Sequence, residues 1–201
     1  MILDLDVSRE TTDRLRAFLD ALLHWNKRIN LISKASEAVA WERHVADSAQ
    51  IYRLAEDNWK SWVDLGSGGG LPGMVIAILA AELRPEGRIT LVEADRRKAA
   101  FLREASRLVG VSVEILPKRS EDLSALGADV VSARAVAPLS ELAAHAQRHM
   151  APGGTGLFLK GRRADTEVAE ALERWHFTCE KIPSQTDPEA AVLKIGDLRR
   201  V

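Results

Sequence analysis

The chain has 201 residues, of which 46% are hydrophobic and 28% are charged, and its formal net charge is −1. This length and composition are typical of a globular domain with a hydrophobic core. They exclude a membrane span, because no apolar run approaches the roughly eighteen residues required, and they argue against a general nucleic-acid binder, which usually carries a strong basic excess.

The first residues and the cysteine content indicate the compartment. The N-terminus MILDLDVSRE is acidic and lacks the basic and apolar stretches of a signal peptide. Cys179 is the only cysteine, which excludes an internal disulfide or a cysteine-cluster metal site. His145 and His149 have the spacing of a zinc-binding pair, but no acidic or thiolate partner accompanies them. We therefore expect a cytoplasmic protein without a metal, in which these histidines lie on an exposed helix face.

We predict that residues 1–60 form a helical N-terminal leader. Apolar residues recur with the helical period over 8–30, and Ser8 is placed to cap that helix. A second helix is predicted over 35–56. The apolar face of the first comprises Leu15, Phe18, Leu19, Leu22 and Ile29.

From residue 61 onward, short β-rich runs alternate with helical segments. We predict strands over 61–66, 88–93, 112–116, 129–134, 155–160, 175–182 and 190–196. Helices are predicted over 73–83, 95–109, 138–150 and 164–174. This alternation predicts an α/β fold of Rossmann-like type, with a mostly parallel seven-stranded sheet and helices on both faces. The last two strands are close in sequence, so at least one should pair antiparallel. We expect residues 1–201 to form a single domain with 61–201 as its core.

The stretch WVDLGSGGGLPG at 62–73 follows the first strand and leads into a helix, which is the position of a cofactor loop. Gly68, Gly70 and Gly73 match the dinucleotide pattern G-x-G-x-x-G, which is compatible with an NAD-dependent oxidoreductase. The register that starts at Gly66 matches the first motif of S-adenosylmethionine-dependent methyltransferases. Asp64 favours the second interpretation, because a carboxylate suits the cationic ammonium end of S-adenosylmethionine and suits a pyrophosphate poorly.

Further segments carry a resemblance to a known family. They are HWNKRINLIS at 24–33, ERHVADS at 42–48, LVEADRRKAAFLRE at 91–104, VVSARAVAPL at 130–139 and FLKGR at 158–162. Together with the glycine loop, and in this order, they resemble the RsmG family (glucose-inhibited division protein B), bacterial methyltransferases of 16S ribosomal RNA. One departure lies in DPEAAVLKI at 187–195, where relatives usually carry a basic residue entering the last strand.

The resemblance implies methyl transfer from S-adenosylmethionine to N7 of one guanine in 16S ribosomal RNA, free or in the small subunit, with S-adenosylhomocysteine as product. The cofactor contacts that it implies are Gly66, Leu71, Ser120, Glu121 and Arg134. By position, Asp64, Gly68 and Glu93 should also touch the cofactor, Glu93 through the ribose hydroxyls. Candidate RNA contacts are Asn30, Arg43, His44 and Asp47 in the leader and Lys160, Arg162 and Arg163 after the fifth strand. We expect a monomer.

Simpler interpretations of several residues stay open. Ser120 has the residue type of a helix N-cap and would start a helix over 121–126. His44 and Asp47 would form a surface pair on one helix. Arg134 would make a structural salt bridge. The whole chain would also suit a non-catalytic protein that binds S-adenosylmethionine and recognises RNA.

The residues after the fourth strand restrict the chemistry. Exocyclic amines are typically methylated beside an Asn/Asp-Pro-Pro-aromatic turn, but here the chain reads SARAVAP. Arg134 cannot act as a base. The acceptor should therefore need no deprotonation, as is true of guanine N7 with its in-plane lone pair. Catalysis then reduces to positioning the acceptor against the methyl group, with Arg134 as the candidate positioning residue.

Overall fold

The computed structural model describes residues 5–201, so the first four residues of the predicted leader lie outside the described residues. These residues form one seven-stranded sheet of order β3-β2-β1-β4-β5-β7-β6. The strands are β1 (Ser61–Leu65), β2 (Arg88–Val92), β3 (Glu114–Leu116), β4 (Ala128–Arg134), β5 (Met150–Lys160), β6 (Trp175–Pro183) and β7 (Ala191–Arg200). All neighbours pair parallel except β7, which is antiparallel to both β5 and β6. The predicted mostly parallel sheet is confirmed.

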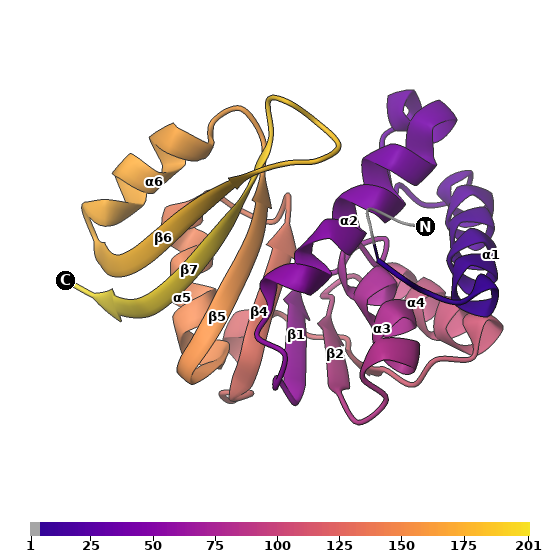
Figure 1. Cartoon of the computed structure of the whole chain (residues 1–201), viewed down its shortest axis with the longest axis horizontal. Coiled ribbons are helices and arrows are strands. Elements are labelled where there is room, and N and C mark those ends of the chain that lie inside the picture. Colours follow the sequence, from indigo (N-terminus) through magenta and orange to yellow (C-terminus); the bar gives the residue numbers. More distant parts are fainter. Residues whose placement is uncertain (1–4) are drawn as a thin grey trace.

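Helices cover both faces of the sheet (Figure 1). The α-helices are α1 (Arg9–Asn26), α2 (Asp47–Ala49), α3 (Gly73–Leu83), α4 (Arg96–Val109), α5 (Leu139–His149) and α6 (Ala164–Leu172). Helices α1, α3 and α4 and the leader cover one face, whereas α5 and α6 cover the other. No helix among the described residues has the length and apolarity needed to span a membrane.

Alternate strand residues supply the two cores, as the two-residue period of a strand requires. In β5, Leu157 and Leu159 point to the face with α3, whereas Phe158 points to the face with α5. Helix α1 packs its Phe18 and Leu22 against the first core, and Ser8 caps it by accepting a hydrogen bond from the Thr11 N–H, as predicted. The leader is thereby built into the same core as the sheet.

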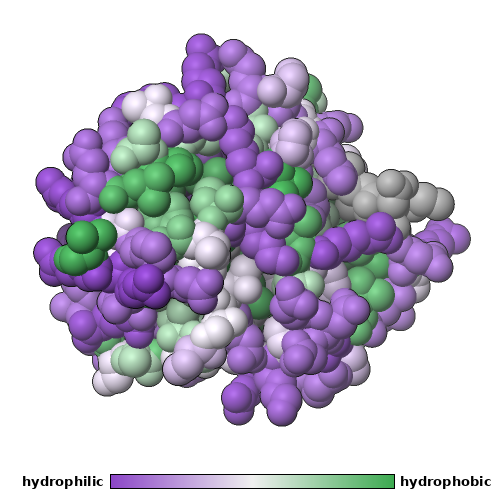
Figure 2. Space-filling model, turned by 60° about the vertical axis from the view of Figure 1, so that its left-hand side comes forward, coloured by the Kyte–Doolittle hydropathy of each residue, from purple (hydrophilic) through white to green (hydrophobic). Residues whose placement is uncertain are grey.

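Large hydrophobic side chains that stay exposed are dispersed over several elements. The face brought forward in Figure 2 is mostly hydrophilic, and its hydrophobic areas are separated from one another by hydrophilic surface. The exposed large hydrophobic residues are Val39, Leu83, Leu108, Val136, Leu172 and Val201.

The second leader helix differs from its prediction. In place of one helix over 35–56, the chain forms η1 (a 3₁₀ helix, Lys34–Val39), η2 (a π-helix, Trp41–Ala46), α2 and η3 (a 3₁₀ helix, Gln50–Leu54). The number of residues per turn therefore changes along this segment, which a single 3.6-residue period does not reveal. Wide π turns occur frequently at functional sites, and this one carries Arg43 and His44.

Two strand boundaries also differ from their predictions. Strand β5 begins at Met150, which pairs with Ala128 across an irregular register, and Pro152, Gly153 and Gly154 lie inside it. Proline and glycine are typical of turns, so the sequence hid this part of the strand. Strand β7 continues to Arg200 because its end pairs with the start of β6.

A buried carboxylate joins β1, β4 and α3 beneath the glycine loop. Asp64 is 0% exposed. Its Oδ2 accepts a hydrogen bond from the Gly73 N–H (3.1 Å), and its Oδ1 accepts one from the Ser132 hydroxyl (2.7 Å). Ser132 in turn accepts a hydrogen bond from the Trp62 indole N–H (2.8 Å). The carboxylate thus fixes the start of α3 relative to two strands.

Gly73 is required at that position for steric reasons. A Cβ there would lie 2.3 Å from Leu91 Cδ2 and 2.7 Å from Asp64 Oδ2. This glycine therefore serves close packing of the helix on the sheet, and no ligand is needed to explain it.

Asp64 gives a prediction about stability and pH. Burial raises the pKa of this carboxyl from 3.8 to about 6, against the opposing effect of its hydrogen bonds from Ser132, Ser67 and Gly73. The folded chain then binds the proton more tightly than the unfolded chain does. The free energy of unfolding should therefore rise as pH falls, by about 1 kcal/mol per pH unit between about 6 and 4 from this group.

Urea unfolding at several pH values in this window measures the effect, with Asp64→Asn as the reference because asparagine does not titrate. The difference in unfolding free energy between the two chains should change with pH in the stated direction. A difference that is constant over this window would contradict the raised pKa.

Candidate active site

The glycine loop presents open backbone at one position, Gly68. Gly66, Gly68 and Gly70 have φ values of +62°, +54° and +81°, a region that side chains rarely adopt. A Cβ on Gly68 would meet nothing closer than the Gly66 carbonyl oxygen, at 3.7 Å. A Cβ on Gly70 would instead lie 2.7 Å from Met74 Cγ. Gly70 therefore serves packing, whereas Gly68 borders open space.

Glu93, at the end of β2, holds the loop from the side. Its Oε2 accepts a hydrogen bond from the Gly68 N–H (2.7 Å), and its Oε1 accepts one from the Asp95 N–H (2.7 Å). The side chain is largely buried, at 8% exposure. Each carboxylate oxygen can accept more than one hydrogen bond, so these contacts leave capacity for ribose hydroxyls.

Two of the predicted cofactor contacts have side chains that point into the protein. Asp64 is fully enclosed beneath the loop, so its carboxylate has no open path to a ligand. The Leu71 side chain is buried in the first core, and its N–H donates to the Ser67 carbonyl. Both residues shape the loop from below, and the surface offered to a ligand consists of backbone.

Ser120 and Glu121 lie in a short turn after β3. The helix predicted over 121–126 is absent from the described chain. In its place is the three-residue 3₁₀ helix η4 (Ser120–Asp122), with Arg119 at the N-cap position. Ser120 is therefore not an N-cap. Its hydroxyl shares a hydrogen bond with His145 Nδ1 at 2.8 Å.

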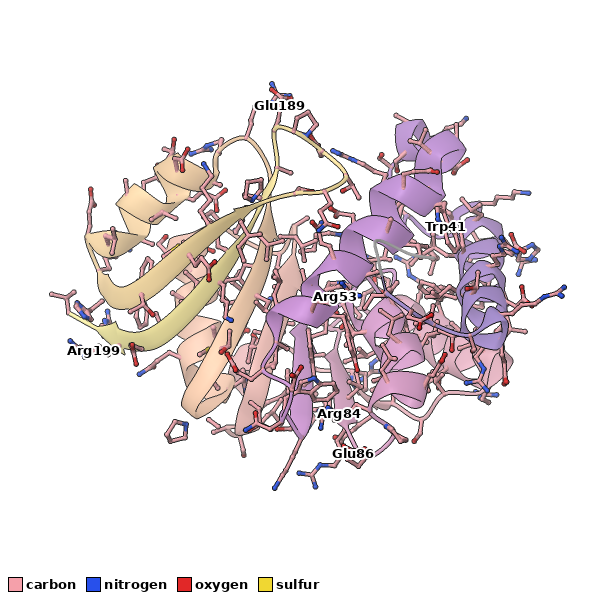
Figure 3. All side chains as sticks on the ribbon, viewed as in Figure 1. Trp41, Arg53, Arg84, Glu86, Glu189 and Arg199 are labelled. Atoms are coloured by element: carbon pink, nitrogen blue, oxygen red, sulfur yellow. The ribbon has the colours of Figure 1, made fainter. Side chains whose placement is uncertain are left out.

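A cavity of about 660 Å³ lies at the carboxyl ends of β4 and β5. Its walls come from the leader, the segment after β4 and the β6–β7 loop, and they include Arg43, His44, Asp47, Arg134 and Lys160. Figure 3 labels Trp41 on the leader and Glu189 at the tip of the β6–β7 loop, both at this end of the molecule. The predicted leader candidates and Arg134 are thus brought together, apart from Asn30.

A second cavity, also of about 660 Å³, lies near the amino ends of β1 and β2, where it is lined by Arg84 and Glu86. Figure 3 labels these two residues at the opposite end from Glu189. In open α/β sheets, ligands bind outside the carboxyl ends of the strands. We therefore place the candidate active site at the first cavity.

Cations on the cavity wall are each paired with a carboxylate. Arg134 Nη1 lies 3.3 Å from Asp47 Oδ2, and Lys160 Nζ lies 2.8 Å from Glu167 Oε2. Arg43 forms an ion pair and hydrogen bond with Asp187 of the β6–β7 loop. The three pairs leave the wall close to electrical neutrality.

Asp47 joins the leader to two distant segments. Besides Arg134, its carboxylate accepts hydrogen bonds from the Thr186 hydroxyl (2.8 Å) and the Gln50 side-chain amide (2.8 Å). Gln50 Oε1 also accepts a hydrogen bond from the Gln185 N–H (3.0 Å). The alternative of a surface pair between His44 and Asp47 is therefore wrong, since each binds other partners.

Arg134 is both ion-paired and part of the cavity wall. Its Nη1 also donates to the Arg43 carbonyl (3.2 Å), and its side chain is 17% exposed. Burial lowers the pKa of its guanidinium, against the opposing charge of Asp47. Arginine stays protonated nonetheless, so it can donate hydrogen bonds and cannot accept a proton.

His44 is neutral at this site. Its Nε2 shares a hydrogen bond of 2.8 Å with the Ser36 hydroxyl, and its Nδ1 is buried without a partner among the described residues. Burial, reinforced by the charges of Arg134 and Arg43, lowers the pKa of His44 to about 4. An imidazole with this pKa is a poor proton acceptor at neutral pH.

The prediction that Lys160 binds RNA phosphates is not supported. Lys160 is buried, and its Nζ donates to the Ala137 carbonyl (2.7 Å) as well as pairing with Glu167. It holds the segment after β4, in which Ala135 has a φ of +54° and Val136 lies over Gly66. Its role here is to fix that segment.

The remaining candidate RNA contacts lie on the surface. Arg162 and Arg163 are exposed and pair with Glu189 and Glu170. Asn30 is exposed and does not line the cavity.

The prediction that His145 and His149 lie on an exposed helix face is wrong for His149. His149 is fully buried, and its Nε2 contacts the Ser120 carbonyl oxygen at 3.0 Å. Among residues 5–201, no group of three or more His, Cys, Asp or Glu side chains could hold a metal ion.

Sequence reasoning missed several polar residues that build this site. Leu31 and Ile32 line the cavity, and their N–H groups donate hydrogen bonds to Asn26 Oδ1 (2.8 and 3.0 Å). Asn26 belongs to the segment HWNKRINLIS and could have been singled out there. Nothing local in the sequence marks Thr186 or Asp187, because their partners lie in the leader.

Comparison with known proteins gives the family. A family model described as rRNA small subunit methyltransferase G (GidB) matches residues 11–190. The ribosomal RNA small subunit methyltransferase G of Ruegeria sp. (strain TM1040) is 50% identical over 199 residues, which cover 99% of this chain and 97% of that protein. The protein of the same name from Cereibacter sphaeroides (strain ATCC 17029) is 46% identical, over 100% of this chain and 98% of that protein.

Solved structures of low identity share the fold. A putative O-methyltransferase from Klebsiella pneumoniae has a TM-score of 0.61 at 18% identity, covering 97% of this chain and 93% of that one. A SAM-dependent methyltransferase from Aquifex aeolicus has a TM-score of 0.60 at 12% identity, covering 81% and 94%. The fold is thus that of Rossmann-like methyltransferases, and the chain belongs to the rRNA small subunit methyltransferase G family.

Proposed function

We propose that this protein transfers a methyl group from S-adenosylmethionine to N7 of a guanine in 16S ribosomal RNA. One observation carries the proposal. The segment 134–138 lines the 660 Å³ cavity on one side and places Val136 over Gly66 of the glycine loop on the other. A methyl donor on the loop and a base in the cavity would meet at this segment.

The loop fits the cofactor through its open backbone. Gly68 lets a ligand approach the main chain, and the Glu93 carboxylate adjoins Gly68. The turn at Ser120 and Glu121 extends the same edge after β3. Bound S-adenosylmethionine supplies an electrophilic methyl group on a sulfonium.

The cavity fits a neutral base better than a phosphate. A phosphate that bound Arg43, Arg134 or Lys160 would have to compete with the carboxylate already paired to each. A guanine needs only hydrogen-bond donors for O6 and can use the remaining N–H groups of an ion-paired arginine. Arg134 is the candidate for that contact.

The chemistry follows from what these groups can do. Arg134 cannot remove a proton, and His44 has too low a pKa to act as an effective base near neutral pH. Guanine N7 carries a free lone pair, so its methylation requires alignment and no base. Asp47 and the Arg43 carbonyl hold Arg134 for that alignment.

The alternative of an NAD-dependent oxidoreductase loses its support. Two of the three glycines of its pattern, Gly70 and Gly73, are explained by contacts with Met74 and Asp64. Membership of a methyltransferase family also excludes it. A non-catalytic RNA-binding role is distinguished by the methylation test below.

The partner is ribosomal RNA or the small subunit, and a monomeric cytoplasmic protein suits that substrate. Arg162 and Arg163 remain candidates for RNA phosphates, because exposed ion pairs are weak and exchange readily.

Cofactor binding is tested at Gly68. In Gly68→Val a side chain would occupy the open space above the loop, so the affinity for S-adenosylmethionine should fall below detection in calorimetry. Gly127→Val is the matched control, since Gly127 has a similar φ of +62° and a Cβ there would meet nothing within 4 Å. Undiminished affinity in Gly68→Val would remove the loop from the cofactor site.

Arg134 tests the chemistry. Arg134→Lys keeps the charge but loses the planar fork, so the single-turnover methylation rate should fall by about tenfold or more while the melting temperature changes little. The rate of the unchanged enzyme should show no titration between about pH 6 and 7, because no base must lose a proton. The measurement is transfer of labelled methyl to 16S ribosomal RNA, with the product mapped as N7-methylguanosine.

Arg9→Lys is the control for a general effect of losing an arginine, as Arg9 lies on α1 away from the cavity and is exposed. A pH dependence with a pKa near 6 to 7 that persists in Asp64→Asn, which removes the only carboxyl with a pKa of about 6 described above, would point to a histidine base and contradict the positioning mechanism. Cofactor binding without any methyl transfer would favour the non-catalytic alternative.

A further inference from the structure

Side chains on one face of α5 form hydrogen bonds with the turn that contains Ser120 and Glu121. His145, Arg148 and His149 lie three and four residues apart, so they share that face. His145 Nδ1 shares a hydrogen bond with the Ser120 hydroxyl (2.8 Å), and His149 Nε2 contacts the Ser120 carbonyl oxygen (3.0 Å). Arg148 donates to the Leu123 carbonyl through Nε and Nη2 (2.9 and 2.7 Å).

Within the turn, the Leu123 N–H also donates a hydrogen bond to the Ser120 carbonyl (3.2 Å). Between β3 and β4 the described chain has only the three-residue η4 as regular structure. Glu121 is about half exposed, and its own cationic neighbours, Arg119 and His145, lie 3.7 and 4.0 Å away. Helix α5 supplies the side-chain hydrogen bonds that fix Ser120 from outside the turn.

His149 is placed for this contact at an energetic cost. Its Nε2 faces a carbonyl oxygen, which can only accept, so Nε2 must carry the proton. Nδ1 is then an acceptor, and it is buried without a partner among the described residues. An apolar side chain would avoid that cost, since an unpaired buried polar atom is unfavourable. The hydrogen bond to Ser120 is what a histidine adds here.

The turn lies at one end of the proposed cofactor site. Because neighbouring strands run in the order β3-β2-β1-β4, the Ser120 turn, Glu93 and the glycine loop follow one another along one edge of the sheet. The cavity for the base adjoins β4 and β5, on the far side of the loop. With the methyl group at the cavity and the ribose at Glu93, the adenine end lies toward Ser120.

We propose that His145 and His149 are positioning residues for the cofactor, which hold Ser120 where the adenine end of S-adenosylmethionine binds. This inference rests on the proposed function. His145 acts through the Ser120 hydroxyl, and His149 acts through the Ser120 carbonyl. Neither histidine touches the cofactor itself.

The test is calorimetric binding of S-adenosylmethionine, S-adenosylhomocysteine and adenosine to the full chain. His145→Ala and His149→Ala should each weaken all three ligands by about fivefold, the effect of losing one ordering hydrogen bond. His145→Asn and His149→Gln should restore affinity to within about twofold, because the amides can replace Nδ1 and Nε2 respectively. Gln147→Ala, an exposed site on the same helix, should have no effect.

Coupling separates positioning from general destabilisation. In a Ser120→Ala background, His145→Ala should cause no further loss, because the hydroxyl through which it acts is gone. An equal loss in both backgrounds would overturn the role of His145. The role of His149 would be overturned if the His149→Gln protein is folded but binds the ligands as weakly as His149→Ala does. If the unchanged protein binds S-adenosylhomocysteine but none of the variants differs from it, this proposal fails and the proposed function stands; if it binds none of the ligands, the proposed function fails.

Discussion

The carboxylate of Asp64 is the constraint on which the functional end of the sheet depends. A buried charge is tolerated only when its oxygens are hydrogen-bonded, so Asp64 requires Ser132 and Gly73 at fixed positions. That requirement sets β4 beside β1 and places the first turn of α3. Glu93, directly after β2, acts in the same way, because its carboxylate accepts a hydrogen bond from the Gly68 N–H. The loop between them is held from below and from the side, which leaves the backbone at Gly68 open.

Charge neutrality at the cavity reconciles the composition with an RNA substrate. The chain has a net charge of −1, and the cations around the cavity are matched by Asp47, Asp187 and Glu167. Such a wall selects by shape and by hydrogen-bond direction more than by attraction for phosphate. Contacts with the RNA backbone, which give affinity but little selectivity, then belong to the exposed surface.

Local sequence patterns were sufficient to predict the sheet and the glycine loop. The range predicted for α3 matches the observed helix, and the segments that carry the resemblance converge around the loop and cavity. The patterns failed where distant contacts decide. Thr186 binds Asp47 from 139 positions away, and Lys160 is drawn into an ion pair instead of facing solvent. Asp64 has a residue type that suits a cationic ligand, and the family resemblance implies Leu71 as a contact, but burial directs both side chains into the protein.

The docking of the β6–β7 loop on the leader has a consequence for biosynthesis. Asp47 and Arg43 emerge from the ribosome early, whereas Thr186 and Asp187, which they bind, are translated much later. In the interval the two side chains lack those partners, so the wall that holds Arg134 cannot be complete. A nascent or prematurely terminated chain that stops before residue 184 lacks this loop and also β7, the strand between β5 and β6, so neither the cavity wall nor the sheet is complete. Competence for the substrate is therefore acquired late, when translation of this loop closes the wall.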